Sequence, residues 1–527
     1  MDIRPQAYLA LLVWIPIGIV MFASMKPIKA GITALVLGVM LLPELAAFDP
    51  PALPPIDKMA VACLASYLGA MLLARRELAR ARFLRGSEAW FLLVIIGNIG
   101  TSLTNPDPVI IGGGIDYDGE TRLPEITLQA MTKYDILSST VRDVLGILLP
   151  FHLGRVLIRT REDALVMARV IAGTMLLLLP LMLFELRFSP QLHYWIYGYY
   201  ALDFAHNMRG GGFKSSLFLS SGLAVAMFLM AGMFSLAMLR RAREKVAGFG
   251  AGVLLPVFWG MLLISRNVGA NIYALAAMPL LLGRKVASAG RLAVVLSLFV
   301  IAFPSLRATQ AFPADDLVAF AAKYSAARAQ SLGFRFDNED ILLERANERQ
   351  WFGWGGFGRN RVYAERGKDI SVTDGEWIIR YGSRGVVGFV GAFGLLVWPI
   401  FMARRRTRRL ADAEAVYVIN ALSLLTALHT LDLLPNGLFT VFPYFFAGAL
   451  AGVCEGMGAP ARGSPGAAIA PQPQAAAMPY PPQPYPPGAY PPGAYPPGAY
   501  PPGAYPPGAY PPGTHPSGSP GVPPRGP

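Results

Sequence analysis

Charged residues are scarce in this sequence. Asp, Glu, Lys and Arg make up only 15% of its 527 residues, against roughly 25% in soluble globular domains. Hydrophobic residues make up 54%, so a chain of this composition would expose extensive apolar surface in water. The shortage of charge therefore excludes an ordinary soluble enzyme and indicates a protein that is embedded in lipid.

Cysteine and the common catalytic motifs are also scarce. The two cysteines, Cys63 and Cys454, lie in apolar stretches and lack the spacing of a metal site or a disulfide framework. The sequence contains no GKS/T phosphate loop, no nucleophile elbow and no HExxH motif. These absences argue against the common nucleotide-binding, serine-hydrolase and zinc-protease sites, and we expect no cofactor.

Apolar stretches long enough to form a membrane-spanning helix of about 20 residues recur along the chain. Thirteen lie near 7–24, 30–48, 58–74, 88–104, 136–158, 164–185, 216–239, 247–265, 267–283, 291–306, 378–403, 414–433 and 437–454. No small-residue cleavage site follows the first stretch, so we expect it to be a membrane helix and not a signal peptide. The predicted fold is an all-α polytopic membrane protein with about 12–13 transmembrane helices.

Basic residues concentrate in every second loop between these stretches. Lys and Arg mark the cytoplasmic loops of membrane proteins, and here they cluster near 26–29, 75–85, 159–161, 240–245, 284–291 and 404–409. The alternation predicts a multi-pass membrane protein whose C-terminus is cytoplasmic, which in a bacterial cell means a protein of the inner membrane. The segments near 105–135, 186–215 and 307–377 would then be periplasmic loops. The net charge of +13 reflects this topology, and we expect no nucleic-acid partner.

The sequence changes character after residue 457. Residues 458–527 are rich in Ala, Gly and Pro, and the tetrapeptide YPPG recurs six times, from Tyr485 to the copy at Tyr510. Such a repeat cannot bury a core, and it favours extended polyproline-like conformations. We expect a transmembrane body over 1–457 followed by a disordered tail, which is either an interaction segment or a dispensable extension.

Arginines in the outer segments stand apart, because the positive-inside rule gives no reason for them. Three consecutive glycines lie between Arg209 and Lys214, and an apolar stretch begins soon after. Glycine lets backbone N–H groups approach an anion closely, and a helix N-terminus attracts negative charge. This segment fits a diphosphate-binding loop, and it equally fits a flexible turn whose basic side chains meet lipid headgroups.

A further outer arginine, Arg266, lies between two apolar stretches in the sequence Ser265-Arg266-Asn267. A single arginine at a membrane surface commonly extends its charged group toward water. Its position on the side of the other outer segments makes a role in ligand binding equally reasonable.

The segment 307–377 balances its charges, with ten Lys or Arg against eleven Asp or Glu. An apolar face over 341–346 predicts a helix that carries Arg345 and Arg349 one turn apart. Trp354 lies in a glycine-rich stretch that favours a tight loop with aromatic faces, which are common contacts of sugar rings. The same arginines could also pair with neighbouring glutamates on a solvated helix.

Three features in this order resemble the O-antigen ligase and polymerase superfamily of bacterial membrane proteins. They are the outer Ser265-Arg266 pair before an apolar helix, the turn Phe352-Gly353-Trp354-Gly355, and the sequence Tyr381-Gly382-Ser383-Arg384-Gly385 at the next helix. The resemblance covers about residues 130 to 450.

The resemblance implies a glycosyltransferase-C-like fold and a metal-independent glycosyltransferase that uses an undecaprenyl-diphosphate-linked glycan. Basic side chains would stabilise the diphosphate leaving group, and a carboxylate would accept the proton of the attacking hydroxyl. Implied partners are membrane lipids, a chain-length regulator and a flippase. The predicted catalytic residues are Arg266, Arg345, Asp374 and Glu376, and the predicted substrate-binding residues are Arg209, Lys214, Arg335, Arg349 and Trp354.

Three functions stay open at this point: a repeat-unit polymerase, a glycan ligase, and a non-enzymatic glycolipid transporter or flippase. Ligases of the superfamily typically carry a histidine in the long loop, whereas 307–377 contains none. This departure favours a polymerase of O-antigen or exopolysaccharide repeat units. A transporter is expected to show internal repeats and broken helices, but no repeat between the halves is evident and polar residues concentrate in the outer segments.

Overall fold

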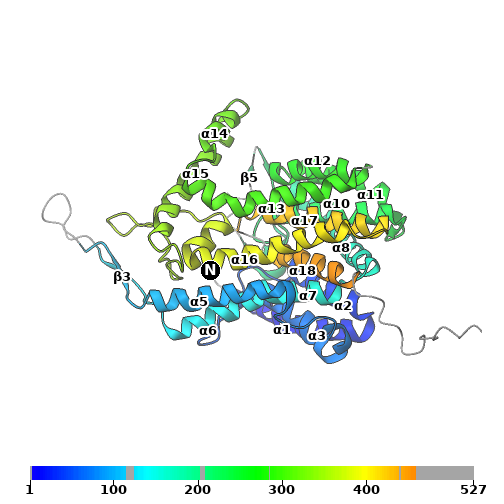
Figure 1. The fold of residues 1–527 in the computed structure, drawn as a ribbon, viewed down its shortest axis with the longest axis horizontal. Helices are drawn as coiled ribbons and strands as arrows, with labels where there is room; N and C mark the ends of the chain where they lie inside the picture. The colour runs from blue at the N-terminus through cyan, green and yellow to red at the C-terminus, as the bar shows by residue number, and fades with distance from the viewer. Residues whose placement is uncertain are drawn as a thin grey trace, which may run out of the picture. The chain divides into compact units, whose positions relative to one another are not determined.

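Helices form most of the chain (Figure 1). The structure, a computed structural model, describes residues 3–113, 124–201, 208–209, 211–283, 285–437 and 441–457. The side chain of Arg209 and the tail at 458–527 lie outside the described residues, so what the sequence predicts for them stays a prediction.

Each of the predicted apolar stretches contains a helix. Among the described residues, eight helices are long and apolar enough to cross a membrane: α1 (Pro5–Ser24), η1 with α5 (Gly86–Trp90, Phe91–Thr104), α6 with η2 and α7 (Lys133–Asp143, Val144–Leu148, Leu149–Leu157), α8 (Arg161–Phe188), α10 (Gly222–Arg241), α13 (Val286–Ala308), α16 (Glu376–Thr407) and α17 (Ala413–Asp432). Shorter apolar helices fill the remaining positions: α2 (Pro27–Leu41), α3 (Lys58–Leu73), α11 (Ala251–Ile264), α12 (Val268–Leu282) and α18 (Val441–Gly456). The prediction of an all-α, multi-pass membrane protein is confirmed. The glycosyltransferase-C-like arrangement and the orientation in the membrane stay predictions.

The basic loops meet at one end of the helix bundle. Arg241 Nη2 lies 2.8 Å from Glu414 Oε1, and Arg406 Nη2 donates to the backbone oxygen of Met457 at 2.7 Å. Loops that the charge pattern assigns to one side of the membrane are therefore neighbours in space. We call this the basic end; its described parts include the loops 74–85, 158–160, 242–250 and 408–412.

The opposite end carries the long segments. We call it the long-loop end, and it includes the described parts of 42–57, 105–132, 189–221, 265–267, 309–375 and 433–440. Lys58 Nζ donates to the backbone oxygen of Phe218 at 2.6 Å and thereby joins two of these segments. Two further helices, α14 (Ala314–Ala322) and α15 (Ala326–Asn347), project from the bundle here (Figure 1).

Short elements complete the loops. Two-stranded antiparallel hairpins are formed by β1 and β2 (Ala47–Phe48, Ile56–Asp57), β3 and β4 (Val109–Ile111, Ile126–Leu128), β5 and β6 (Met208–Arg209, Gly212–Phe213), and β7 and β8 (Lys245–Val246, Phe249–Gly250). The short helices are α4 (Arg75–Leu78) and α9 (Leu192–Tyr197).

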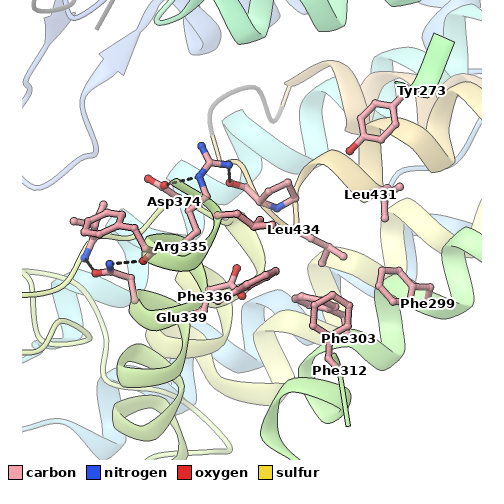
Figure 2. A pocket seen from close by; sticks show the side chains of 15 residues that line it. Tyr273, Phe299, Phe303, Phe312, Arg335, Phe336, Glu339, Asp374, Leu431 and Leu434 are labelled. Carbon is pink, nitrogen blue, oxygen red and sulfur yellow. Dashed lines mark hydrogen bonds and ion pairs between the residues drawn. The ribbon is translucent and has the colours of Figure 1, made fainter. Parts of the chain in front are cut away.

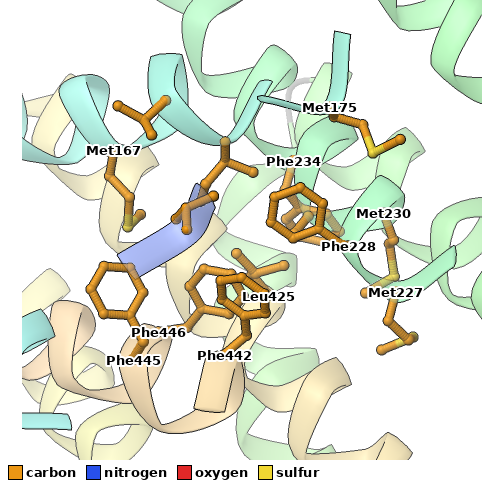
Figure 3. Packing of buried hydrophobic residues seen from close by; sticks show 14 of the residues in the cluster. Met167, Met175, Met227, Phe228, Met230, Phe234, Leu425, Phe442, Phe445 and Phe446 are labelled. Atoms are coloured by element: carbon orange, nitrogen blue, oxygen red, sulfur yellow. The ribbon is translucent and has the colours of Figure 1, made fainter. Parts of the chain in front are cut away.

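The main hydrophobic core surrounds α10, which packs against α8, α11, α12 and α17. This helix is apolar on all sides, as expected of a helix with neighbours all round it, and 94% of its most apolar stretch is buried. Figure 3 shows the aromatic part of this core, where the rings of Phe228 and Phe442 lie 5.1 Å apart between centroids. Flexible methionines such as Met167 and Met175 fill the space around the rings.

A break in α16 joins this membrane helix to the long segment. Gly385 has φ of 64° inside the helix, a conformation that favours glycine. The break leaves backbone groups without helical partners, and the loop before it supplies them. Trp354 N–H donates to the carbonyl of Gly382 at 2.8 Å, and Val386 N–H donates to the carbonyl of Gln350 at 2.8 Å. The two glycine-containing sequences that carried the family resemblance are therefore in direct backbone contact.

Candidate functional site

A cavity of about 230 Å³ lies at the long-loop end between α12, α13, α15 and α17. Its wall is mainly aromatic and aliphatic, and in Figure 2 the rings of Phe299, Phe303 and Phe312 lie toward one side of it. The polar groups of Arg335 and Asp374 lie on the other side. An apolar chamber with a few convergent polar groups is the usual form of a small-molecule site.

Arg335 and Asp374 form an ion pair at this cavity. Arg335 lies on α15 and Asp374 just before α16, and Arg335 Nε is 3.3 Å from Asp374 Oδ2. Arg335 Nη1 also donates to the backbone oxygen of Pro435 at 3.4 Å. The two side chains are 36% and 42% exposed, so their attraction is weak and an anionic ligand could compete for the guanidinium. The structure thus brings together two predicted site residues that are far apart in the sequence.

A buried carboxylate, Glu339, also lines the cavity, and sequence reasoning missed it. Trp377 Nε1 donates to Glu339 Oε1 at 3.2 Å, while Oε2 lies 3.4 Å from Arg307 Nε. Oε2 accepts no hydrogen bond from the described residues. Burial raises the pKa of Glu339 from 4.5 to about 7. A carboxylate with a pKa near neutrality and an oxygen that accepts no hydrogen bond is suited to accept a proton.

The signal for Glu339 was present in the helical pattern. Glu339 lies three, four and seven residues before Leu342, Leu343 and Ala346, which places it on the same buried face of α15. A charge on an apolar face is expensive to bury unless it has partners. That position distinguishes Glu339 from the other acidic residues of the segment.

Arg307, at the end of α13, fixes the position of this part of α15. Its Nη2 donates to the backbone oxygen of Phe336 at 3.0 Å and to Asp340 Oδ1 at 2.8 Å. Its guanidinium carbon lies 5.0 Å from the centroid of the Phe336 ring, within the range of a cation–π contact. Because Arg307 is itself buried, it positions Glu339 and does not lie open to a ligand.

A second arginine group surrounds Trp354, further along α15. The guanidinium carbons of Arg345 and Arg349 lie 3.3 Å and 4.3 Å from the centroid of the Trp354 ring. Trp354 Nε1 donates to the backbone oxygen of Arg345 at 2.6 Å. The arginines therefore cover this buried ring, and the accessible aromatics of the loop are Trp351 and Phe357. With a helical rise of 1.5 Å per residue, Arg345 lies about 15 Å from Arg335 along the helix.

Glu376 lies in a different setting from the one predicted. Its Oε1 is 2.7 Å from Arg380 Nε, and Arg380 Nη1 is 2.7 Å from Asp143 Oδ1, within a buried network between membrane helices. Asn98 Nδ2 donates to the other oxygen of Asp143 at 2.9 Å. Glu376 does not line the cavity. Its ion pair explains its burial, so among the predicted base candidates only Asp374 lies at the cavity.

Arg266 also lies apart from Arg335. It lines a second cavity of about 420 Å³, and its guanidinium packs against the β5–β6 hairpin, where a Cβ on Gly212 would be 2.5 Å from Arg266 Nη2. Lys214 follows the same hairpin and packs beside Gly222 at the start of α10. The predicted group of outer cations is therefore divided among three places, and the catalytic roles predicted for Arg266 and Arg345 stay predictions.

Comparison with known proteins adds no assignment. No protein-family model and no curated protein sequence matches this chain. Among the described residues, no group of three or more His, Cys, Asp or Glu side chains is placed to hold a metal ion.

Proposed function

We propose that this protein is a membrane glycosyltransferase that polymerises undecaprenyl-diphosphate-linked repeat units into O-antigen or exopolysaccharide. The observation that carries the proposal is the cavity that combines a mainly apolar wall with Arg335, Asp374 and Glu339. A lipid-linked diphosphate needs both an apolar surface and a cation. Glycosyl transfer to a hydroxyl also needs a proton acceptor.

In the proposed reaction, the anomeric carbon of the donor glycan loses its bond to the diphosphate and forms a bond to an acceptor hydroxyl oxygen. The diphosphate leaves with the bonding electron pair, and Arg335 stabilises its charge by charge-assisted hydrogen bonds. Glu339 takes the proton of the attacking hydroxyl. Asp374 pairs with Arg335 when no substrate is bound and turns the guanidinium toward the cavity.

Orientation forms part of the proposal. The basic loops meet at the end of the bundle opposite this cavity, and such loops face the cytoplasm in most membrane proteins. The cavity would then face the periplasm, and a flippase would have to deliver its substrate there. The break in α16 does not favour the transporter alternative, because the backbone of 350–355 pairs with the groups that the break exposes.

The test uses a strain that lacks the gene and is complemented with variants. We expect Arg335→Ala to insert normally and to accumulate single lipid-linked repeat units, and Arg335→Lys to restore part of the polymer because lysine keeps the charge without the bidentate geometry. Arg361→Ala is the matched control. Arg361 is a 41% exposed arginine of the same segment that pairs with Asp369 and does not line the cavity.

The material that accumulates in the deletion strain distinguishes the alternatives. A polymerase leaves single repeat units on the carrier lipid, a ligase leaves long polymer on that lipid, and a flippase leaves units on the cytoplasmic face. Normal polymer length with Arg335→Ala would remove the basis for placing the reaction in this cavity.

A further inference from the structure

The second cavity, of about 420 Å³, has a chemical character different from that of the first. It lies between the turn that joins α11 to α12 and the first turn of α15. It is lined by Trp259, Leu263, Arg266, Asn267, Val268, Asn271, Ile272, Leu275 and Arg328. The lining thus combines two arginines with aliphatic and amide side chains. Unlike Glu339 and Asp374 at the first cavity, none of these described lining residues is acidic.

The aliphatic side chains of this cavity point away from the protein. Leu263 is 60% exposed, Ile272 57% and Leu275 64%. They belong to α11 and α12, two of the apolar helices of the bundle. In a multi-pass membrane protein, exposed leucine and isoleucine on such helices contact acyl chains. The cavity therefore opens sideways toward lipid, at the ends of these helices where lipid headgroups begin.

Two arginines from distant segments form the polar side of the cavity. Arg266 occupies the tight turn between α11 and α12 with φ of 58°, a conformation unusual for a residue other than glycine. Arg328 belongs to the first turn of α15 and is exposed. Two guanidinium groups at one cavity favour a phosphate, which accepts hydrogen bonds from arginine with good geometry.

An amide oxygen adds specificity. Asn271 Nδ2 donates to the backbone oxygens of Leu262 at 2.9 Å and Asn267 at 2.6 Å, which fixes the orientation of the amide. Its Oδ1 is buried and accepts no hydrogen bond from the described residues. A buried acceptor of this kind needs a donor, and a ligand hydroxyl group would supply one.

We propose that the second cavity binds one anionic phospholipid whose headgroup carries a hydroxyl, of the phosphatidylglycerol type. Its phosphate lies between Arg266 and Arg328, a headgroup hydroxyl donates to Asn271 Oδ1, and its acyl chains follow Leu263, Ile272 and Leu275. None of the described lining residues is a carboxylate that could accept a proton, so the proposed role of this cavity is to hold a lipid. This inference does not depend on the proposed function.

Native mass spectrometry of the full chain in detergent measures this binding directly. The probes are phosphatidylglycerol, zwitterionic phosphatidylcholine, and phosphatidylmethanol, which keeps the charge but lacks the glycerol hydroxyls. We expect one phosphatidylglycerol to bind roughly tenfold more tightly than phosphatidylcholine. The reason is that one additional charge-assisted hydrogen bond changes the affinity by about a factor of ten. Phosphatidylmethanol should bind with intermediate affinity.

The variants separate the site from general lipid contact. Arg328→Ala should abolish the preference for phosphatidylglycerol without harm to the fold, because Arg328 is exposed. Arg266→Lys should weaken it while keeping the charge beside Gly212. Arg187→Ala, which removes an exposed arginine of the same end of the bundle that does not line the cavity, should bind lipid as the unmodified protein does.

Four results would overturn the proposal. The first is equal affinity for phosphatidylglycerol and phosphatidylcholine, and the second is an unchanged preference in both Arg328→Ala and Arg266→Lys. The third is displacement of the lipid by millimolar inorganic phosphate, which would reveal a site for the free anion. The fourth is displacement by undecaprenyl phosphate at equal concentration, which would assign the site to the carrier lipid. Failure of the Arg335 test would leave all four measurements unaffected.

Discussion

Replacement of Glu339 by glutamine tests the proposed chemistry most sharply, because it should change activity and stability in opposite directions. Glutamine keeps an acceptor for Trp377 Nε1 but cannot take a proton. We expect transfer to fall by roughly two to four orders of magnitude, the usual contribution of a general base. Glu344→Gln, an exposed glutamate on the same helix, should leave activity unchanged.

The stability effect follows from the pKa of Glu339, which burial raises from 4.5 to about 7. The folded protein holds this proton more tightly than the unfolded chain does. The contribution of Glu339 to the free energy of unfolding is therefore fully present below about pH 4.5, and it is lost as pH rises through about 7. The pKa of Glu339 is higher in the folded protein than in the unfolded chain by about 2.5, which corresponds to about 3 kcal/mol of unfolding free energy lost by pH 9. Glu339→Gln should thus unfold at a higher temperature than the unmodified protein at pH 9 and at a similar temperature at pH 5.

The assay combines two measurements on purified protein in detergent. Polymer formation is followed on membrane extract from the deletion strain, which supplies the lipid-linked substrate, and thermal unfolding is followed at each pH. The activity of the unmodified protein should rise about tenfold between pH 5 and pH 6 and level off above pH 8, as the carboxylate form becomes dominant. A flat profile over this range, or full activity of Glu339→Gln, would refute the assignment of Glu339 as the proton acceptor. Equal unfolding temperatures at pH 9 would refute the reasoning about burial.

Two further substitutions test how the long segment is held. Gly385→Ala should lower stability by more than about 2 kcal/mol, because φ is 64° and a Cβ would lie 2.2 Å from the carbonyl carbon of Trp351. The control is Gly173→Ala, because a Cβ at Gly173 meets nothing within 4 Å. Arg359→Ala should cost about 2 kcal/mol or more, since the buried guanidinium donates four hydrogen bonds and two of their acceptors are buried, whereas Arg361→Ala should cost less than about 1 kcal/mol. Thermal unfolding of the detergent-solubilised variants measures both, and equal midpoints within either pair would contradict the prediction.

The helix positions could be predicted from the sequence because they depend on local properties. An apolar stretch of sufficient length satisfies all its backbone hydrogen bonds as a helix in lipid, and this holds without knowledge of its neighbours. The grouping of the basic loops was predictable for a similar reason, since a chain that crosses the membrane repeatedly must place alternate loops on the same side. The ion pair between Arg241 and Glu414 agrees with that grouping.

The candidate site was only partly predictable. Arg335 and Asp374 were chosen from their segment, and the structure brings them to one cavity. Arg266 and Arg345 were grouped with them because they are basic and lie in predicted outer segments, but charge and side of the membrane do not determine which helix ends become neighbours. Glu376 was chosen as a carboxylate beside Asp374. At the start of a helix its side chain turns toward Arg380, one turn further along.

The sequence by itself determined that this protein is a multi-pass helical membrane protein. Composition and the length of each apolar stretch are local properties, so they specify the helices without knowledge of how these pack. Only the tertiary structure decided which polar groups share a cavity. Glu339 became a candidate proton acceptor when the packing of α15 against α16, beside Arg307 at the end of α13, removed it from water and raised its pKa. Desolvation of that kind is a property of the surrounding elements, and no local pattern of residues specifies it completely.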